Sequence, residues 1–506
     1  MHPYRDSFLA AASKEYTDLK RRNTFRHIPK TSATKTLPLL WVFTYKFDTN
    51  GYLDKFKARL CVRGDLQQPV RLDTYAATLA ARAFRALMAI AAAFDLEIFQ
   101  YDAVNAFTNS TLDETVYCEC PQGFEQSDQF LLLLRALYGL RRSPLLWLKE
   151  FSCTLTELGL KEIESCLFTN DWLVVFFYID DIIVMCRTKD LPKLYPFKEA
   201  LFSRYEMRDL GELSWFLGIR IIRDRSKRKI RLCQDSYIDK ITKKFNLEYG
   251  KTPHIPMLTE ELIPYDGKAS LQEILAYQQK VGSLLYAATI TRPDVARTAS
   301  KLSEFLQNPS PRHLGAVDQA IAYLNDTKTL AIEYSALTNS QQAFVCASDA
   351  AFADDPDTRR STEGYLFKLF GGPIDWHSTK QKTVTTSSTE AELLALTYAS
   401  KETTWWKRFF QSISLDPGHD PSILCDNQQT IGLVTKELMK LTTKLRHVDI
   451  HKNWLRQEVQ AGRIRVDWVP TKDMPADGLT KALPRQRHES FIRQLGLVDI
   501  GNKLKN

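Results

Sequence analysis

Apolar residues run almost without a break from residue 173 to 185 in the sequence LVVFFYIDDIIVM, where two adjacent carboxylates, Asp180 and Asp181, interrupt them. The Val, Ile and Phe content predicts two short strands, Leu173–Tyr178 and Ile182–Met185. The run is too short for a membrane span, which needs about 20 apolar residues. Adjacent carboxylates repel each other and lose solvation on burial. They therefore indicate a solvated turn, a shared proton or a bound divalent cation.

Apolar periodicity also divides the rest of the chain. Apolar residues at three- and four-residue intervals predict helices, whereas alternation bounded by Gly, Asn or Pro predicts strands. The predicted helical stretches are residues 7–27, 76–94, 131–159 and most of 271–334.

Strand-forming segments lie between these helices. LLWVFTYKFDTNGYLDKFKARLCVRG predicts a hairpin with Thr49–Asn50–Gly51 as its turn. DLEIFQYDAVNAF predicts a strand that ends near Asp102, and a strand-rich unit begins at Phe344. Helices that alternate with hairpins favour a multidomain α+β or α/β fold over a doubly wound parallel sheet.

The composition is that of an ordinary globular protein, with 44% hydrophobic and 25% charged residues among 506. This length allows roughly two to four domains. The net charge of +8 is a mild basic bias, compatible with a polyanionic partner. Nine cysteines without a disulfide or zinc pattern indicate reduced thiols inside a cell. The N-terminal residues MHPYRDSFLAAASKEY contain no apolar signal core, so we expect a protein that is not secreted.

The most basic segment is RIIRDRSKRKIRL, with seven basic residues and one acid from Arg220 to Arg231. Two interpretations remain open. It is either a solvated hairpin or an edge that contacts phosphate groups.

A third carboxylate from a separate strand would favour the metal interpretation of the Asp180–Asp181 pair. Asp102 is the candidate, because it lies at the end of an apolar strand. Carboxylates and substrate phosphates are the ligands that Mg²⁺ prefers, and two ions about 3.5–4 Å apart can catalyse phosphoryl transfer.

Several motifs in a fixed order support this interpretation. FQYDAVNAFTNSTLDETVYCECPQGF, RALYGLRRSPLLWLKEF and FFYIDD resemble the reverse transcriptase of copia-type LTR retrotransposons. LGELSWFLGIRI, VGSLLYAATITRPDVA and SSTEAELLAL fit the same family, and the similarity runs from about residue 7 to residue 497. The resemblance implies a right-hand polymerase with fingers, palm and thumb, in which Asp102 and Asp180 are the main metal ligands and Asp181 completes the triad.

The resemblance also implies residues that bind the nucleotide and the primer. The nucleotide pocket would contain Lys57, Arg59, Phe107, Gln122 and Tyr178. The two cations would hold the triphosphate, and the Phe107 ring would exclude a 2′-hydroxyl. The primer grip would be Trp215, Phe216, Leu217 and Gly218. A solvated surface for the two cations, and core packing for the aromatic residues, remain the alternatives.

The C-terminal third contains a second set of acids on separate predicted elements. In SSTEAELLAL, Ser387 and Glu390 form a capping box, S-x-x-E, so Glu390 has a structural role at the helix start. Glu392 lies about 200° further round the helix and is the predicted metal ligand. The resemblance implies a ribonuclease H domain whose metal ligands are Asp349, Glu392, Asp426 and Asp477.

Three departures or unassigned features accompany this match. Lys472 stands where retroviral ribonucleases H carry a histidine, and lysine is a poor proton shuttle at neutral pH. Ala351 and Phe352 replace an Asp-Trp pair that is frequent in relatives. In RHVDIH, the residues His447, Asp449 and His451 have metal-ligand spacing without a third element, which favours a structural or nucleic-acid-contacting role.

The resemblance implies the following layout: 1–35, a helical lead-in; 36–260, fingers and palm; 261–340, a thumb or connection segment; 341–485, a ribonuclease H-like domain; and 486–506, a tail. The implied activity is RNA- and DNA-directed DNA synthesis with cleavage of RNA–DNA hybrids. It needs two Mg²⁺ ions, or Mn²⁺ in their place, at each active site. The implied partners are an RNA template, a DNA primer, hybrid duplex, deoxynucleoside triphosphates and the integrase or capsid parts of a longer polyprotein, with no membrane.

The implied location is the cytoplasm, in virus-like particles, or the nucleus. Two other functions remain open. One is a nucleic-acid-binding remnant without activity, and the other is a nuclease whose polymerase site is inactive. All seven predicted acids are present, which disfavours a decayed remnant.

Overall fold

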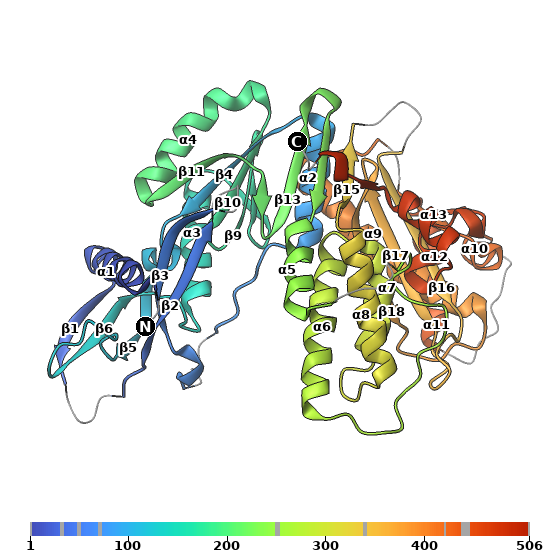
Figure 1. Cartoon of the computed structure of the whole chain (residues 1–506). Helices are drawn as coiled ribbons and strands as arrows, with labels where there is room; N and C mark the ends of the chain where they lie inside the picture. The colour runs from blue at the N-terminus through green and yellow to red at the C-terminus, as the bar shows by residue number, and fades with distance from the viewer. Residues whose placement is uncertain are drawn as a thin grey trace. The chain divides into compact units, whose positions relative to one another are not determined.

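The computed structural model describes residues 3–30, 35–47, 52–68, 73–247, 253–336, 342–418, 421–436 and 446–503. The chain divides into two compact units (Figure 1). The first contains residues 1–79 and 98–212, and the second contains residues 80–97 and 213–506. The proline-rich stretch 253–264 lies within the second unit.

The first unit is built mainly from antiparallel strands. Its largest sheet has six strands in the order β11-β4-β10-β9-β8-β7, and two smaller sheets have the orders β1-β6-β5 and β2-β3. The strands are β1 Phe25–Pro29, β2 Leu39–Phe47, β3 Leu53–Val62, β4 Glu97–Ala103, β5 Thr111–Cys118, β6 Gln129–Arg135, β7 Lys161–Glu164, β8 Leu167–Thr169, β9 Leu173–Tyr178, β10 Asp181–Cys186 and β11 Met207–Glu212.

Three helices and three short 3₁₀ turns complete this unit. They are α1 Arg5–Arg21, η1 Gly64–Leu66, η2 Ala106–Asn109, α3 Ser143–Glu157, η3 Thr188–Asp190 and α4 Leu191–Arg204. The predicted hairpin over residues 39–64 is confirmed as β2–β3, although its turn at 49–51 lies outside the described residues.

Two helix predictions in the first unit extend too far. Residues 25–29 form a strand rather than the end of the first helix, because β1 pairs with β6. Residues 131–135, the start of the second stretch, belong to the strand β6 rather than to a helix. A short apolar run fits a buried strand and a buried helix equally well, so only its pairing partners decide between them.

The helix α2 Ala81–Phe94 belongs to the second unit, although the chain segments on either side of it belong to the first. The second unit also contains two five-stranded sheets. The first sheet is antiparallel, in the order β12-β13-β14-β15-β21. Its strands are β12 Trp215–Phe216, β13 Ile219–Asp224, β14 Lys229–Cys233, β15 Leu330–Ser335 and β21 Leu497–Asp499. The C-terminal stretch that the sequence assigns to a tail thus contains a paired strand.

The other sheet is mixed, in the order β18-β17-β16-β19-β20. β16, β17 and β18 are antiparallel neighbours, whereas β19 and β20 run parallel to β16. The strands are β16 Phe344–Ala351, β17 Thr362–Leu369, β18 Gly372–Lys380, β19 Ser422–Cys425 and β20 Arg465–Trp468.

Helices pack around both sheets of the second unit. The cluster formed by α5, α6, α7 and α8 has its own apolar core, which includes Tyr277, Leu284 and Ile321. The remaining helical elements of this unit are η4 Arg225–Lys227, α5 Asp235–Phe245, α6 Leu271–Ile290, η5 Pro293–Val295, α7 Ala296–Ser303, α8 Pro311–Asp326, α9 Ser388–Ser412, α10 Gln428–Thr435, α11 Arg446–Gln460, η6 Thr471–Asp473, α12 Asp477–Thr480, α13 Arg485–Leu495 and η7 Gly501–Lys503.

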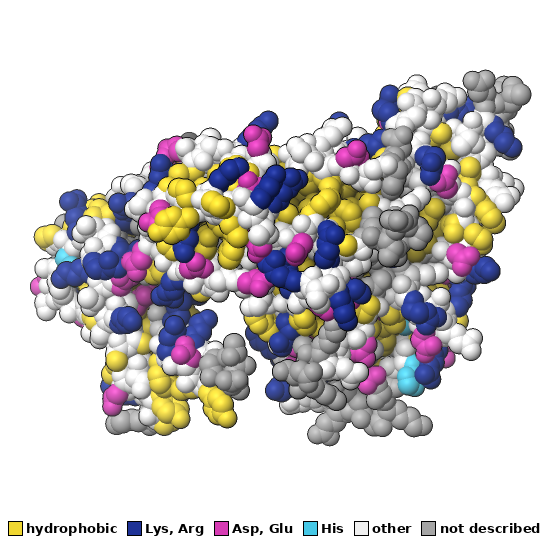
Figure 2. All heavy atoms as spheres, turned by 90° about the horizontal axis from the view of Figure 1, so that it is seen from above, with side chains coloured by type: hydrophobic (Ala, Val, Ile, Leu, Met, Phe, Trp, Pro, Cys, Tyr) yellow, Lys and Arg dark blue, Asp and Glu magenta, His cyan; other side chains and the backbone are white. Residues whose placement is uncertain are grey.

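The basic segment at 220–231 forms the predicted hairpin, β13–β14, and most of its cations contact acids or carbonyls of the protein. Arg223 lies 2.7 Å from Asp95, and Arg228 donates to the Ala93 carbonyl at the end of α2. Figure 2 shows that Lys and Arg side chains are spread over the viewed face among Asp and Glu. The hairpin therefore fastens α2 to the sheet, which accounts for much of its charge without a phosphate ligand.

All nine cysteines lie within the described residues, and none forms a disulfide. In the same part of the chain, no helix has the length and apolar character needed to traverse a bilayer.

Candidate active sites

The first candidate site is built on the tight turn between β9 and β10. Tyr178 pairs with Asp181, so Ile179 and Asp180 form a two-residue turn. Ile179 has a φ of 58°, a left-handed conformation that β-branched residues rarely adopt. The indole of Trp147 donates to the Ile179 carbonyl at 2.7 Å. The turn therefore places Asp180 directly after a strained residue, Ile179, whose carbonyl the buried Trp147 holds.

The structure brings the third predicted acid next to this turn. Asp102 lies on β4, the neighbour of β10 in the six-stranded sheet. The amide of the next residue, Ala103, donates to the Asp180 carbonyl at 2.9 Å. Asp102 itself is partly exposed, and Arg208 lies 3.7 Å from its carboxylate. The strand of Asp102 thus lies beside the Asp180–Asp181 turn, and the charge of Asp102 acts on both acids. Binding of a metal ion by these three acids stays a prediction.

Burial controls the protonation of the pair on the turn. Burial raises the pKa of Asp181 to about 6, and the charges of Asp180 and Asp102 act in the same direction. The amide of Gln100 opposes this shift by donating to Asp181 Oδ1 at 3.0 Å. The pKa of Asp180 is also raised, chiefly by burial and then by Asp102, while nearby cations act against the shift.

Two of those cations are the predicted triphosphate ligands, Lys57 and Arg59. They lie two residues apart on β3, so their side chains share one face of the strand. Burial and the neighbouring Arg59 lower the pKa of Lys57, whereas the charge of Asp102 raises it. Arg59 stacks over the ring of Tyr138 at 4.9 Å. The basic face of β3 therefore lies within electrostatic range of the acids.

The other predicted nucleotide-binding residues have mixed surroundings. Phe107 is buried in η2 and packs edge-on against Tyr138, with ring centroids 4.7 Å apart. Gln122 is exposed, and its main-chain carbonyl accepts a hydrogen bond from the indole of Trp41. Their roles, and that of the half-buried Tyr178, stay predictions.

The predicted primer grip belongs to the second unit. Trp215 and Phe216 form β12, and Leu217 and Gly218, with φ of 50° and 75°, make the turn to β13. Phe216 is buried and packs against Phe84 on α2, with ring centroids 4.9 Å apart. The packing role that the sequence leaves open for Phe216 therefore exists, and primer binding by this hairpin stays a prediction.

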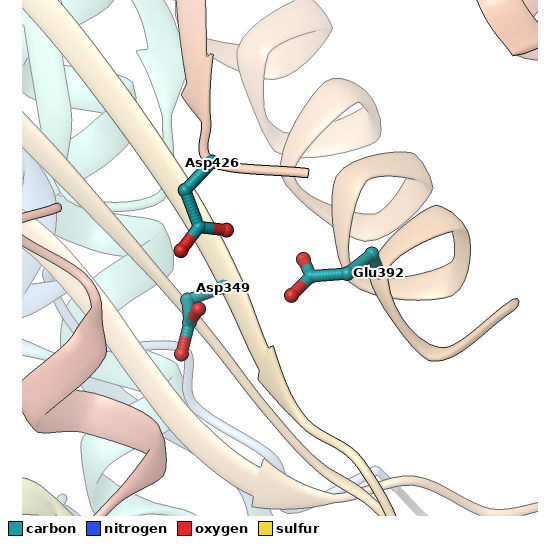
Figure 3. Close-up of side chains that lie close together, drawn as sticks. All are labelled: Asp349, Glu392 and Asp426. Atoms are coloured by element: carbon teal, nitrogen blue, oxygen red, sulfur yellow. The ribbon is translucent and has the colours of Figure 1, made fainter. Parts of the chain in front are cut away.

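The second candidate site gathers three acids from three elements of the second unit. Asp349 projects from β16, Glu392 from α9, and Asp426 follows the end of β19 (Figure 3). Figure 3 shows the three carboxylates pointing toward one another. One oxygen from each lies within 4.8 Å of the others, and in the described part of the chain no other set of three His, Cys or acidic residues converges to this degree.

Two oxygens of this cluster are buried without a hydrogen-bond partner in the part of the chain that the structure describes, which tests how well the cluster fits a cation. Asp349 is 1% exposed and Glu392 is 6% exposed. Among the described residues, Asp349 Oδ1 and Glu392 Oε2 are buried and have no hydrogen-bond partner. Burial raises the pKa of both carboxyls. The charges of Asp349 and Asp426 raise the pKa of Glu392 further. A divalent cation would satisfy these oxygens, and the all-carboxylate donor set fits Mg²⁺ or Mn²⁺.

The fourth predicted acid, Asp477, is also buried nearby, at the start of α12. Its charge contributes to the raised pKa of Asp349. The close packing of α12 on the sheet depends on Gly364, which pairs with Asp349 across β16 and β17. A Cβ at this position would lie 2.9 Å from the Leu479 Cβ. Asp477 itself accepts hydrogen bonds from Lys481 at 2.8 Å and Arg487 at 2.7 Å.

Glu390 and Glu392 have the separate roles that the sequence predicts, with one correction. The Ser387 hydroxyl accepts from the Glu390 amide, as in a capping box. The Glu390 carboxylate, however, accepts from the amide and hydroxyl of Thr386 rather than from the Ser387 amide. It thus holds the residue before the cap, while Glu392 points into the acid cluster.

Comparison with known proteins places these two sites in a family. A family model described as reverse transcriptase (RNA-dependent DNA polymerase) matches residues 22–259. The Pol polyprotein of transposon TNT 1-94 from Nicotiana tabacum is 32% identical over 98% of this chain and 38% of that protein. The transposon Ty5-1 protein YCL074W of Saccharomyces cerevisiae is 33% identical over 58% of this chain and 97% of that protein. The chain belongs to the reverse transcriptase family of copia-type retrotransposons.

The match to this reverse transcriptase family covers only part of its larger members. The chain spans 38% of the tobacco polyprotein and 32% of the RE2 polyprotein of Arabidopsis thaliana. The structure of a foamy viral protease-reverse transcriptase in complex with dsDNA aligns with this chain at 15% identity and a TM-score of 0.46. The alignment covers 92% of this chain and 83% of the viral chain. The predicted fold class is confirmed as a mixed α/β polymerase region followed by helices and a ribonuclease H-like domain.

Sequence reasoning missed the residues that support the acids in both sites. Gln100 precedes Asp102 by two positions on β4 and holds Asp181, and Trp147 holds the turn. Lys481 follows Asp477 by four residues, a spacing that signals contact on a helix. Arg487 had no local signal, because its contact with Asp477 depends on the packing of α13 against α12.

Two features of the ribonuclease H-like region keep their earlier interpretation. Lys472 lies in η6, and its main-chain carbonyl accepts from Gln494. The side chain of His447 lies outside the described residues, and Asp449 pairs with Lys452 at 2.8 Å. A structural or nucleic-acid-contacting role for this helix therefore stays the prediction.

Proposed function

We propose that this chain is an RNA- and DNA-directed DNA polymerase joined to a ribonuclease H that cleaves RNA–DNA hybrids. The observation that carries the polymerase half is the meeting of Asp102 with the Asp180–Asp181 turn inside the region matched by the reverse transcriptase family. Lys57 and Arg59 provide positive charge on the same side, as binding of a triphosphate requires.

In this proposal each side chain has a defined task. Asp102, Asp180 and Asp181 would hold two divalent ions, which would supply activation of a hydroxyl nucleophile and charge stabilisation at the leaving phosphate oxygen. Lys57 and Arg59 hold the triphosphate of the incoming nucleotide. Phe107 would contact the sugar of the incoming nucleotide, and Gln122 and Tyr178 would line the nucleotide pocket. The hairpin of Trp215 to Gly218 positions the primer.

The ribonuclease half rests on the buried cluster of Asp349, Glu392 and Asp426. Their unpartnered oxygens would hold a divalent ion, and Mg²⁺ fits the donor set. The expected substrate contacts are to backbone and duplex shape, so cleavage should depend little on base sequence.

Primer extension tests this proposal. The purified chain should extend oligo(dT) on poly(rA) in Mg²⁺ and should cleave the RNA strand of a preformed hybrid. Cleavage without extension would identify a nuclease with an inactive polymerase site. Binding of the hybrid without either reaction would identify an inactive nucleic-acid-binding remnant.

The acid side of the pH profile should depend on Asp181. Because its pKa in the metal-free protein is raised to about 6, the carboxylate gains a proton as the pH falls through 6 and then binds cations poorly. The Mg²⁺ concentration for half-maximal primer extension should therefore rise about tenfold for each pH unit below 6. Titrations at pH 5, 6, 7 and 8 at constant ionic strength measure it.

Gln100→Leu is the matched variant for this titration. It removes the amide that lowers the pKa of Asp181, so the Mg²⁺ requirement should begin to rise at a higher pH than in the unaltered chain. An identical Mg²⁺ requirement at pH 5 and pH 7 would contradict the assignment of Asp181.

A further inference from the structure

Asp477 differs from the other three acids of the ribonuclease H-like site in its partners. Both of its oxygens are already bound to cations, Oδ1 to Lys481 at 2.8 Å and Oδ2 to Arg487 at 2.7 Å. By contrast, the clustered carboxylates of Asp349 and Glu392 each retain a buried oxygen without a hydrogen-bond partner among the described residues. The open cation position therefore lies with Asp349, Glu392 and Asp426, and Asp477 is excluded from it by its own partners.

Lys481 also reaches the neighbouring acid. Its ammonium group lies 3.5 Å from Asp349 Oδ2, so it bridges Asp349 and Asp477. The hydroxyl of Thr480, the preceding residue, donates to the same oxygen of Asp349. The end of α12 and the residue after it thus place a hydroxyl and an ammonium between these two acids, which is where a second divalent ion would need ligands.

The charges of the site balance with a single divalent ion. Four ionised carboxylates carry four negative charges, which one divalent ion, Lys481 and Arg487 together neutralise. A second divalent ion between Asp349 and Asp477 would lie beside the Lys481 ammonium, and like charges at such distances repel strongly away from bulk water. It would have to displace that group before it could bind.

We propose that the ammonium group of Lys481 occupies the second cation position of the ribonuclease H-like site, so that this site holds one divalent ion, bound by Asp349, Glu392 and Asp426. This inference rests on the proposed ribonuclease function and differs from the sequence expectation of two ions at this site. Lys481 would then offer the phosphate of the hybrid a fixed point charge beside the bound ion.

Counting bound Mn²⁺ in the full-length chain tests the inference without an activity assay. The parent protein for this test carries Asp102→Asn and Asp180→Asn, which remove polymerase-site ligands, and free Mn²⁺ is measured by electron paramagnetic resonance. The parent should bind one tight equivalent, and Glu392→Gln should remove it. Lys481→Met should add a second equivalent that binds at least about tenfold more tightly than any second ion in the parent.

Two matched variants separate charge from side-chain replacement. Lys481→Arg keeps the positive charge and should still give one equivalent. Lys240→Met makes the same substitution at an exposed position on α5 and should leave the parent titration unchanged. Two tight equivalents in the parent, or an unchanged titration for Lys481→Met, would overturn the inference.

Asp477→Asn provides a test that does not depend on the folding of Lys481→Met. Because Asp477 does not hold the first ion, this variant should keep the tight equivalent within about threefold of the parent affinity, below the usual loss for a metal-supporting residue. Loss of the tight ion would overturn the inference. If the parent and Glu392→Gln bind the same number of ions, the acid cluster binds none, and the proposed ribonuclease function itself is wrong. Two tight ions in the parent would instead contradict only the one-ion inference.

Discussion

Asp180→Asn in the full-length chain should abolish primer extension, by about three orders of magnitude or more, and leave cleavage of the RNA–DNA hybrid intact. The substitution removes a charged oxygen ligand from the turn that Asp102 joins, while the asparagine keeps the size of the side chain. The second acid cluster, on β16, α9 and β19, is untouched. Extension of oligo(dT) on poly(rA) and hybrid cleavage are measured on the same preparation.

The matched control for this variant is Asp171→Asn. Asp171 is an exposed aspartate in the same unit, two residues before β9, and its substitution makes the same change of charge. It should keep both activities. Loss of hybrid cleavage in a folded Asp180→Asn protein would show that the two reactions do not use separate sites.

Glu392→Gln should have the opposite effect. Glu392 contributes a buried, unpartnered oxygen to the cluster with Asp349 and Asp426, and glutamine replaces that charge with a neutral amide. Hybrid cleavage should fall by about three orders of magnitude or more, whereas primer extension should stay within about twofold. Cleavage of a labelled RNA strand in a preformed hybrid measures the first effect.

Glu390 provides the comparison within the same helix turn. Its carboxylate accepts from the amide and hydroxyl of Thr386 and has no place in the acid cluster. Glu390→Gln should lower the free energy of unfolding by about 1 kcal/mol, as a weakened helix cap does, and keep hybrid cleavage. If Glu390→Gln abolished cleavage and Glu392→Gln did not, the assignment of the two glutamates would be reversed.

The acids could be predicted from the sequence because each lies in a short pattern with its own chemical signal. The Asp180–Asp181 pair interrupts an apolar run, and β9 is found at the predicted Leu173–Tyr178. The prediction of β10 misses by one residue at each end, because Asp181 itself pairs with Tyr178. The position of an acid in or beside a strand can thus be predicted from the local sequence.

The support around the acids could not be predicted in the same way. The bond from Gln100 to Asp181 spans 81 positions, and the bond from Trp147 to Ile179 spans 32. Such contacts depend on which strands become neighbours, and nothing local encodes that. The one missed residue within reach of sequence reasoning was Lys481, four positions after Asp477, because the spacing places both on one helix turn.

The placement of α2 has a consequence for how this chain can be made and divided. α2 is almost wholly buried and packs against β14, β15 and β18, although the residues before and after it in the chain belong to the other unit. During synthesis this Ala-rich segment must wait for strands that emerge more than 130 residues later. No single cut yields two independent halves, and a fragment that stops at residue 259 would keep β14 but leave α2 without β15, β17 and β18.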